Sequence, residues 1–219
     1  MIMGKRKNYK GSFYHIYNRG VDKRAIFKDS HDFKRFFLSL REFNSTETIG
    51  SIYERQALKQ KKYSDPLVDM VAYAVLPNHF HLLLYARDDN AISLFMQRLA
   101  TGYTKYFNNK YKRTGALFQG RYKIKHIDND SYLYQVADFI NHNDKVHQFG
   151  SRTSKYVKTS LSEYVNKAEL VKPCPHLFGV VPDDYKTTSL ERLSRTIEER
   201  ERKKSVGRAY EGVASYLHE

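Results

Sequence analysis

The sequence predicts an α+β fold, a ferredoxin-like split βαβ arrangement with helices on one face of a central antiparallel sheet, followed by a helical C-terminal tail. Three observations predict it. Short runs with a period of two, typical of strands, occur near the start of the chain and again in its middle. Runs with helical spacing of apolar residues follow them. The resulting order is strand, helix, two strands, helix, basic loop, helix.

The first strand and the first helix lie within the first 40 residues. The stretch SFYHIYNRG alternates apolar and polar side chains and ends at Gly20, which indicates a strand. Apolar residues then recur at helical spacing over residues 33–40, and Asp29 or Ser30 can cap this helix. The stretch QALKQKKYSDP is expected to be a charged, solvated connection to the next strands.

The middle of the chain changes period twice. LVDMVAYAVLPNHFHLLLYA predicts two strands joined at Pro77 and Asn78, a pair that favours a tight connection. From Asn90 the apolar spacing becomes helical and ends near residues 108–109. KYKRTGALFQGRYKIKHI follows with six basic residues and no acidic residue, and its glycines favour a loop or hairpin. SYLYQVADFINHN is then a helix.

The C-terminal part is less regular. KPCPHLFGVVPDD is broken by prolines and predicts a loop, and a charged helical tail follows with an expected break at Gly207. We therefore expect a flexible basic N-terminus at 1–11, one domain at 12–150 and an extension with a helical tail at 151–219.

Charge and composition narrow the function. A net charge of +14 and a pI near 9.6 favour a polyanionic partner such as nucleic acid. No apolar run approaches the length of a membrane-spanning helix and no signal peptide is visible, so we expect a soluble intracellular protein without a membrane partner. The single cysteine, Cys174, excludes an internal disulfide and a thiolate-rich zinc site.

His79 and His81 are the first candidate site. In a strand they would project from one face while Phe80 enters the core. Two imidazoles that close can share a cation. A structural zinc site that combines them with other histidines is an alternative, and it predicts metal-dependent folding. His15, on the first strand, is expected to pack in the sheet.

Four blocks, YHIYNRG, YAVLPNHFHLLL, FMQRLATGYTKYFNNKYKRTGALFQGRYK and DNDSYLYQVADFINHN, resemble the single-tyrosine HUH transposases in their order and spacing over about residues 10–150. These form the insertion-sequence-200-like group, which includes the REP-associated tyrosine transposases. The resemblance implies an HUH nuclease fold for residues 12–150. It also implies single-stranded hairpin DNA as partner, a homodimer, and a cytoplasmic, nucleoid-associated location.

The resemblance also assigns residues. His79 and His81 match the His-hydrophobic-His motif and would hold Mg²⁺ or Mn²⁺, with Asn143 as the third ligand. The family's nucleophilic tyrosine, which attacks a phosphodiester to give a 5′-phosphotyrosine and a 3′-OH, corresponds to Phe139. Because phenylalanine has no hydroxyl, this chain is expected to be deficient in cleavage.

Three explanations of Phe139 remain open at this point. The first is a Tyr-to-Phe change that traps an uncleaved DNA complex. The second is a naturally non-catalytic regulator that binds hairpin DNA or RNA. The third is that another tyrosine replaces residue 139 as the nucleophile. Tyr132 and Tyr134 lie at least a turn farther from the metal, and Tyr103 is expected in the core or facing DNA.

Basic side chains interleaved with aromatic rings suit phosphate neutralisation and base stacking, although a merely solvated charged loop would show the same pattern. Tyr111 and Phe118 are further residues available for stacking. The predicted DNA-binding residues are Arg19, Lys105, Lys110, Lys112, Arg113, Arg121, Tyr122, Lys123 and Lys125.

Overall fold

A five-stranded sheet organises the chain, which we describe from a computed structural model over residues 7–48, 50–53, 65–146, 156–165 and 184–216. The strand order is β4-β1-β3-β2-β5, and each neighbouring pair is antiparallel. The strands are β1 (Phe13–Arg19), β2 (Val68–Leu76), β3 (His79–Ala86), β4 (Lys123–Ile127) and β5 (Lys158–Thr159). The first four strands in this order form the ferredoxin-like split βαβ unit, so the predicted fold class is confirmed.

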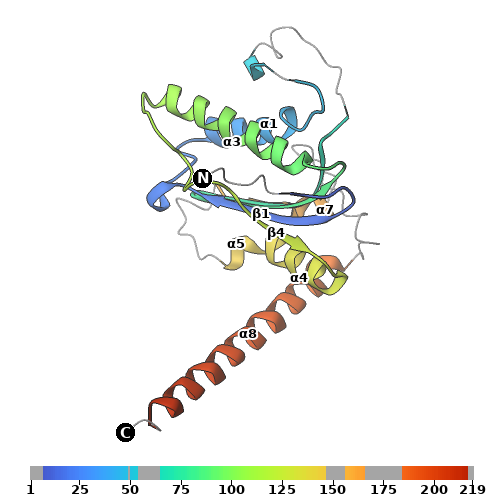
Figure 1. The fold of residues 1–219 in the computed structure, drawn as a ribbon, viewed down its shortest axis with the longest axis vertical. Coiled ribbons are helices and arrows are strands. Elements are labelled where there is room, and N and C mark those ends of the chain that lie inside the picture. Colours follow the sequence, from blue (N-terminus) through green and yellow to red (C-terminus); the bar gives the residue numbers. More distant parts are fainter. Residues whose placement is uncertain (1–6, 49, 54–64, 147–155, 166–183, 217–219) are drawn as a thin grey trace.

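Helices cover both faces of this sheet (Figure 1). One face carries α1 (Ser30–Glu42) and α3 (Ala91–Lys110), and the other carries α4 (Asp130–Asn141) with the short α5 (Asn143–Val146). Smaller elements are the 3-10 turn η1 (Val21–Lys23) and α7 (Leu161–Val165). A 32-residue helix, α8 (Tyr185–Tyr216), begins beside α4 and runs away from the body of the molecule.

The larger core lies between the sheet and the α1/α3 pair. Asp29 caps α1 as predicted, since its side chain accepts the backbone N–H of Asp32 at 2.9 Å. Gly102 of α3 lets the helix approach Phe43, because a Cβ at this glycine would lie 2.3 Å from the ring. Buried apolar side chains fill the space between the helices, among them Phe36, Phe37, Leu40, Phe95, Leu99 and Tyr103.

The second core lies under α4, on the face that the prediction left uncovered. Leu133, Val136, Ala137 and Ile140 recur at helical spacing and are buried. They pack with small and branched side chains of the sheet, namely Ala72, Ala74, Leu76 and Leu83. Burying an apolar side chain contributes about 1.5–3 kcal/mol, so this stripe holds α4 firmly on the sheet.

Two local predictions differ from the structure. Residues 123–127, expected in a loop or hairpin, form the edge strand β4, in which Lys123 and Lys125 are exposed, as lysines on edge strands commonly are. The helix α8 continues through Gly207, where a break was expected; one glycine costs a helix only about 1 kcal/mol. Most of the QALKQKKYSDP and KPCPHLFGVVPDD stretches lie outside the described residues.

None of the helices in the described part of the chain is both long and apolar enough to cross a membrane.

Candidate active site

The two strand histidines point to the same side of β3, as predicted. His79 and His81 are partly exposed, and Phe80 between them is 2% exposed in the larger core. The two imidazole centroids lie 5.3 Å apart, edge to face. A two-residue connection at Pro77 and Asn78 pairs Leu76 with His79 and so places the histidines at the start of β3.

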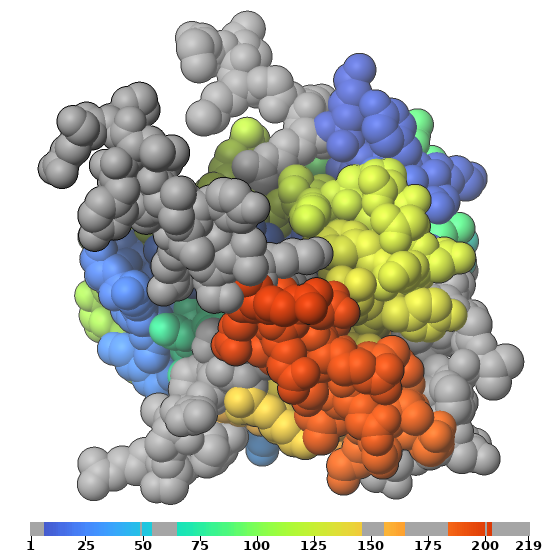
Figure 2. Space-filling model, turned by 90° about the horizontal axis from the view of Figure 1, so that it is seen from below, coloured from blue at the N-terminus to red at the C-terminus, as the bar shows by residue number. Residues whose placement is uncertain are grey.

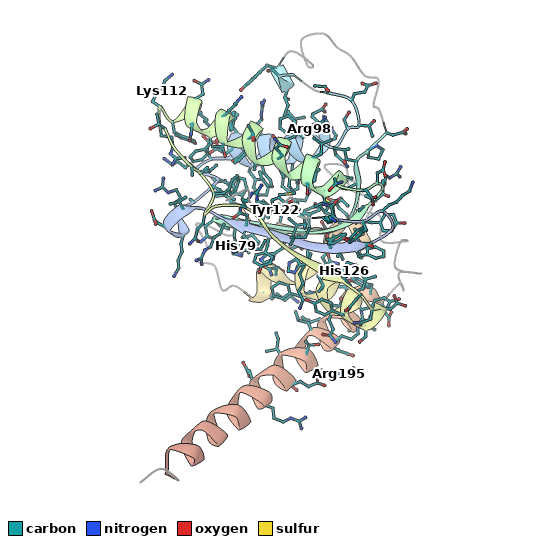
Figure 3. The ribbon with its side chains drawn as sticks, in the orientation of Figure 1. His79, Arg98, Lys112, Tyr122, His126 and Arg195 are labelled. Atoms are coloured by element: carbon teal, nitrogen blue, oxygen red, sulfur yellow. The ribbon has the colours of Figure 1, made fainter. Side chains whose placement is uncertain are left out.

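Cross-strand pairing extends this surface, because residues directly opposite on neighbouring strands share a face. Figure 3 shows His79 on the side of the sheet that carries α4 and α5. We call this surface the histidine face. Besides the two histidines of β3 it includes Phe13, His15, Tyr17 and Arg19 from β1, and Lys123 and Lys125 from β4.

A neighbouring amide fixes the tautomer of His79. The Nδ1 atom of His79 lies 2.6 Å from Oδ1 of Asn78. The amide of Asn78 is itself oriented, because its Nδ2 donates to the carbonyl oxygen of Lys23 at 3.2 Å. An amide oxygen can only accept, so Nδ1 of His79 carries the proton and Nε2 carries the lone pair.

His81 lies among aromatic rings and is bonded to a third histidine. Its Nδ1 is 2.9 Å from Nε2 of His15. Tyr17, directly across from it on β1, stacks on the His81 ring at a centroid distance of 5.6 Å. Desolvation in the sheet, with a smaller effect of the Lys125 charge, lowers the pKa of His15 to about 4, so His15 is neutral at neutral pH.

Residue 139 lies against the same rings. Phe139 of α4 meets His81 edge to face at 5.4 Å and His15 at 6.4 Å. Among the alternative tyrosines, Tyr103 is fully buried on the opposite face and donates to the carbonyl oxygen of Ile26 at 2.7 Å. Phe139, which the resemblance aligns with the nucleophile, therefore contacts two rings of the histidine face.

Asn143 begins α5, just after α4 ends. Its side chain is fully buried, and its Nδ2 lies 3.5 Å from the carbonyl oxygen of Phe139. Its Oδ1 is buried without a hydrogen-bond partner among the described residues. A buried acceptor without a partner is costly, and an amide oxygen is a ligand that hard cations such as Mg²⁺ and Mn²⁺ accept. Imidazole nitrogens bind such ions too, so the residue types match this ligand set, while among the described residues the hydrogen bond of Asn143 runs to Phe139 and none joins it to either histidine.

A structural zinc site has less support. Within the described ranges, no group of three or more His, Cys, Asp or Glu side chains is arranged to hold a metal ion. A set made of two imidazoles and one carboxamide is of a different composition, so that observation does not bear on it.

The back of α4 is fixed by a buried polar network that the sequence did not indicate. Asp138, 1% exposed, accepts from Nε of Arg192 at 2.7 Å and from the Tyr185 hydroxyl at 3.1 Å. Asn141 donates to the same hydroxyl at 3.0 Å and accepts from the hydroxyl of Ser160 at 2.5 Å. Figure 2 shows α8, in orange and red, against the yellow-green segment that includes the start of α4. The C-terminal extension thus fixes the helix that carries Phe139.

The predicted DNA-binding residues fall into three places. Arg19, Lys123 and Lys125 are exposed on the histidine face. Lys105, Arg121 and Tyr122 line a cavity of about 930 Å³ between α3 and the segment before β4. The remaining three, Lys110, Lys112 and Arg113, lie at the far end of α3, where Figure 3 labels Lys112.

Two of the last three have internal partners. Lys110 forms ion pairs with Asp29 at 2.6 Å and with Asp32 at 2.7 Å. Arg113 donates to Oδ1 of Asn108 at 2.8 Å and to a backbone carbonyl at 2.9 Å. Lys110 thus links the end of α3 to the start of α1, and Arg113 holds the loop after α3, so the charge of both is partly used within the fold.

Comparison with protein families gives one match. The family model described as "Transposase IS200 like" matches residues 44–143, which include β2, β3, α3, β4, α4 and Asn143. Residues 44–143 are therefore similar to the IS200-like transposases. The match confirms the resemblance drawn from the sequence, and both candidate metal-binding histidines lie inside this IS200-like region.

Other comparisons add little to the IS200-like assignment. No curated protein matches the chain. A solved structure of a REP-associated tyrosine transposase bound to a REP hairpin is similar, with 15% sequence identity and a TM-score of 0.49, over 75% of this chain and 86% of that chain.

Proposed function

We propose that the chain binds single-stranded DNA containing a hairpin, at a divalent-cation site for Mg²⁺ or Mn²⁺ formed by His79, His81 and Asn143. The observation that carries the proposal is the grouping on one sheet face of both imidazoles and the ring of residue 139. The buried amide oxygen of Asn143 supports it, and the family assignment supports the transposase class.

A bound cation would polarise a DNA phosphate and stabilise negative charge that develops on it. The chain's own residues prepare this site. Asn78 sets the tautomer of His79, and the exposed cations of the histidine face, Arg19, Lys123 and Lys125, are placed to attract the DNA backbone.

Position 139 decides the chemistry. With tyrosine there, the phenol would attack the phosphodiester, forming a 5′-phosphotyrosine and releasing a 3′-OH that can later rejoin. Phe139 has no hydroxyl that could make this attack, so we infer that this chain binds hairpin DNA without cleaving it through that residue. The same observation favours a second candidate function, that of a naturally non-catalytic regulator that binds nucleic-acid hairpins.

A Phe139→Tyr variant tests the site and separates the two candidates. The substrate is a pool of labelled single-stranded hairpin oligonucleotides with randomised flanks, incubated with Mn²⁺. We expect an adduct that survives denaturation for Phe139→Tyr, and none for the wild-type chain or for Phe139→Tyr combined with His81→Ala. A variant that binds the pool yet never forms the adduct would favour the regulator.

The salt dependence of binding tests the DNA-facing surface. Lys123→Gln should lower the slope of log affinity against log salt by about 0.7, the value for one phosphate contact on single-stranded DNA. The matched control is Lys34→Gln, because Lys34 is also an exposed lysine but lies on α1, across the sheet. Equal slopes for the two variants would remove β4 from the interface.

A further inference from the structure

We propose that His15 is a positioning residue for the cation site. It accepts a hydrogen bond from the protonated Nδ1 of His81 and thereby keeps the Nε2 lone pair of His81 available for the cation. The inference rests on the proposed function, because it concerns the orientation of one of the proposed ligands. The resemblance and the family match assign no role to His15.

A hydrogen bond joins the side chains of His15 and His81. Nε2 of His15 and Nδ1 of His81 lie 2.9 Å apart, and the planes of the two rings are inclined by only 27°. The contact joins strands β1 and β3, whose register pairs Tyr17 with His81 and so brings His15, two residues earlier on the same face, beside it. The sheet register therefore holds this pair together.

Either His81 or His15 could donate the hydrogen bond between them, and the choice decides whether His81 can bind a cation. A neutral imidazole has one protonated nitrogen and one nitrogen with a lone pair. If His81 donated from Nδ1, its Nε2 would keep the lone pair that a metal requires; if His15 donated, Nε2 of His81 would carry the proton and could not bind a cation. Metal-binding histidines commonly donate their other N–H to a protein acceptor.

The two proposed histidine ligands have the same kind of arrangement at Nδ1. His79 has an amide oxygen, that of Asn78, at its Nδ1, and His81 has the imidazole of His15 at the same atom. Each ligand thus has a partner that can set the same tautomer. A phenylalanine at position 15 would fill similar space but could not accept, so the acceptor atom is the feature that packing alone does not require.

The experiment compares His15→Phe, which keeps a ring and removes the acceptor, with His15→Gln, whose amide oxygen can accept. The matched control is His126→Phe, because His126 lies on the neighbouring strand β4 opposite Tyr14, whose side chain enters the core on the other face of the sheet. The first readout is the ¹⁵N chemical shifts of the His81 ring in metal-free protein. The second is Mn²⁺ affinity by calorimetry.

We expect wild-type His81 to carry its proton on Nδ1 and to lose this preference in His15→Phe. Mn²⁺ affinity should fall about 10- to 100-fold in His15→Phe, with recovery in His15→Gln and no change in His126→Phe. A proton on Nε2 of His81 in the wild-type protein would overturn the inference, even if His15→Phe failed to fold. So would undiminished Mn²⁺ affinity in His15→Phe. A wild-type chain that binds no Mn²⁺ would overturn the proposed cation site itself.

Discussion

Arg192 should be one of the most sensitive positions for stability, although it lies on α8, outside the family match. It forms two hydrogen bonds with Asp138, at 2.7 and 3.1 Å, and the Asp138 side chain is 1% exposed whereas that of Arg192 is 39% exposed. Replacing Arg192 by methionine keeps much of the chain length and leaves a buried carboxylate without its cation.

The expected loss in the free energy of unfolding follows from the different exposure of the two side chains. Removing one partner of a buried ion pair costs about 3–5 kcal/mol. Because water reaches one side of Arg192 and Tyr185 still donates to Asp138, we expect the lower end, about 3 kcal/mol of the free energy of unfolding. At a urea dependence of about 1–3 kcal/mol per molar, the midpoint should fall by about 1–3 M.

The loss should also depend on pH. Burial raises the pKa of Asp138, while Arg192 and Tyr185 act to lower it. Without Arg192, the pKa of Asp138 in the folded state rises further above its value in the unfolded state. The folded state then takes up a proton at a higher pH than the unfolded state does, so the free energy of unfolding of the variant rises as pH falls. The deficit of Arg192→Met relative to wild type should therefore shrink from pH 7 to pH 5.

Urea unfolding followed by far-UV circular dichroism measures both effects, since the chain has no tryptophan. The control is Arg192→Met combined with Asp138→Asn, which removes the buried charge as well and should recover most of the loss. A deficit below about 1 kcal/mol that does not change with pH would refute the reasoning, because Asp138 would then not depend on Arg192 for its charge.

Three further expectations concern other parts of the fold. Ser160→Ala removes a fully buried hydroxyl that donates to the side-chain amide oxygen of Asn141 on α4. The free energy of unfolding, measured with urea, should fall by about 1–3 kcal/mol, and an unchanged value would show that α4 does not need this contact. Gly102→Ala should lower the melting temperature despite alanine's better helix propensity of about 1 kcal/mol, because the new Cβ would meet the ring of Phe43; a rise would mean that the ring can move aside. Hydrogen bonding from Lys110 lowers the pKa of Asp29 to about 2, so the stability difference between wild type and Asp29→Asn should be constant near neutral pH and disappear as pH falls from about 4 through 2; a difference that persists at pH 2 would exclude this ion pair as its source.

Features that depend on neighbours in sequence were predictable. The cap at Asp29, the hairpin at Pro77 and Asn78, and the common face of His79 and His81 each follow from periods or turns within a few residues. Local rules apply there because strand and helix geometry repeats over two to four residues.

Features that depend on long-range pairing were not predictable. The strand β4 gains its ladder from β1, more than 100 residues earlier, whereas the glycines of the basic segment favoured a loop or hairpin. His15 reaches His81 across 66 residues, and Lys110 reaches Asp29 across 81. The predicted DNA contact of Lys110 stays a prediction, and the structure adds the ion pairs with which such a contact would compete.

The network behind α4 bears on how the protein can be divided for expression. The family match stops at residue 143, whereas the polar groups of Asp138 and Asn141 are satisfied by side chains between residues 160 and 192. A fragment truncated just after the match would leave these groups exposed to solvent and α4 held by its apolar face alone. The shortest fragment that keeps the candidate site intact therefore extends through the first turns of α8.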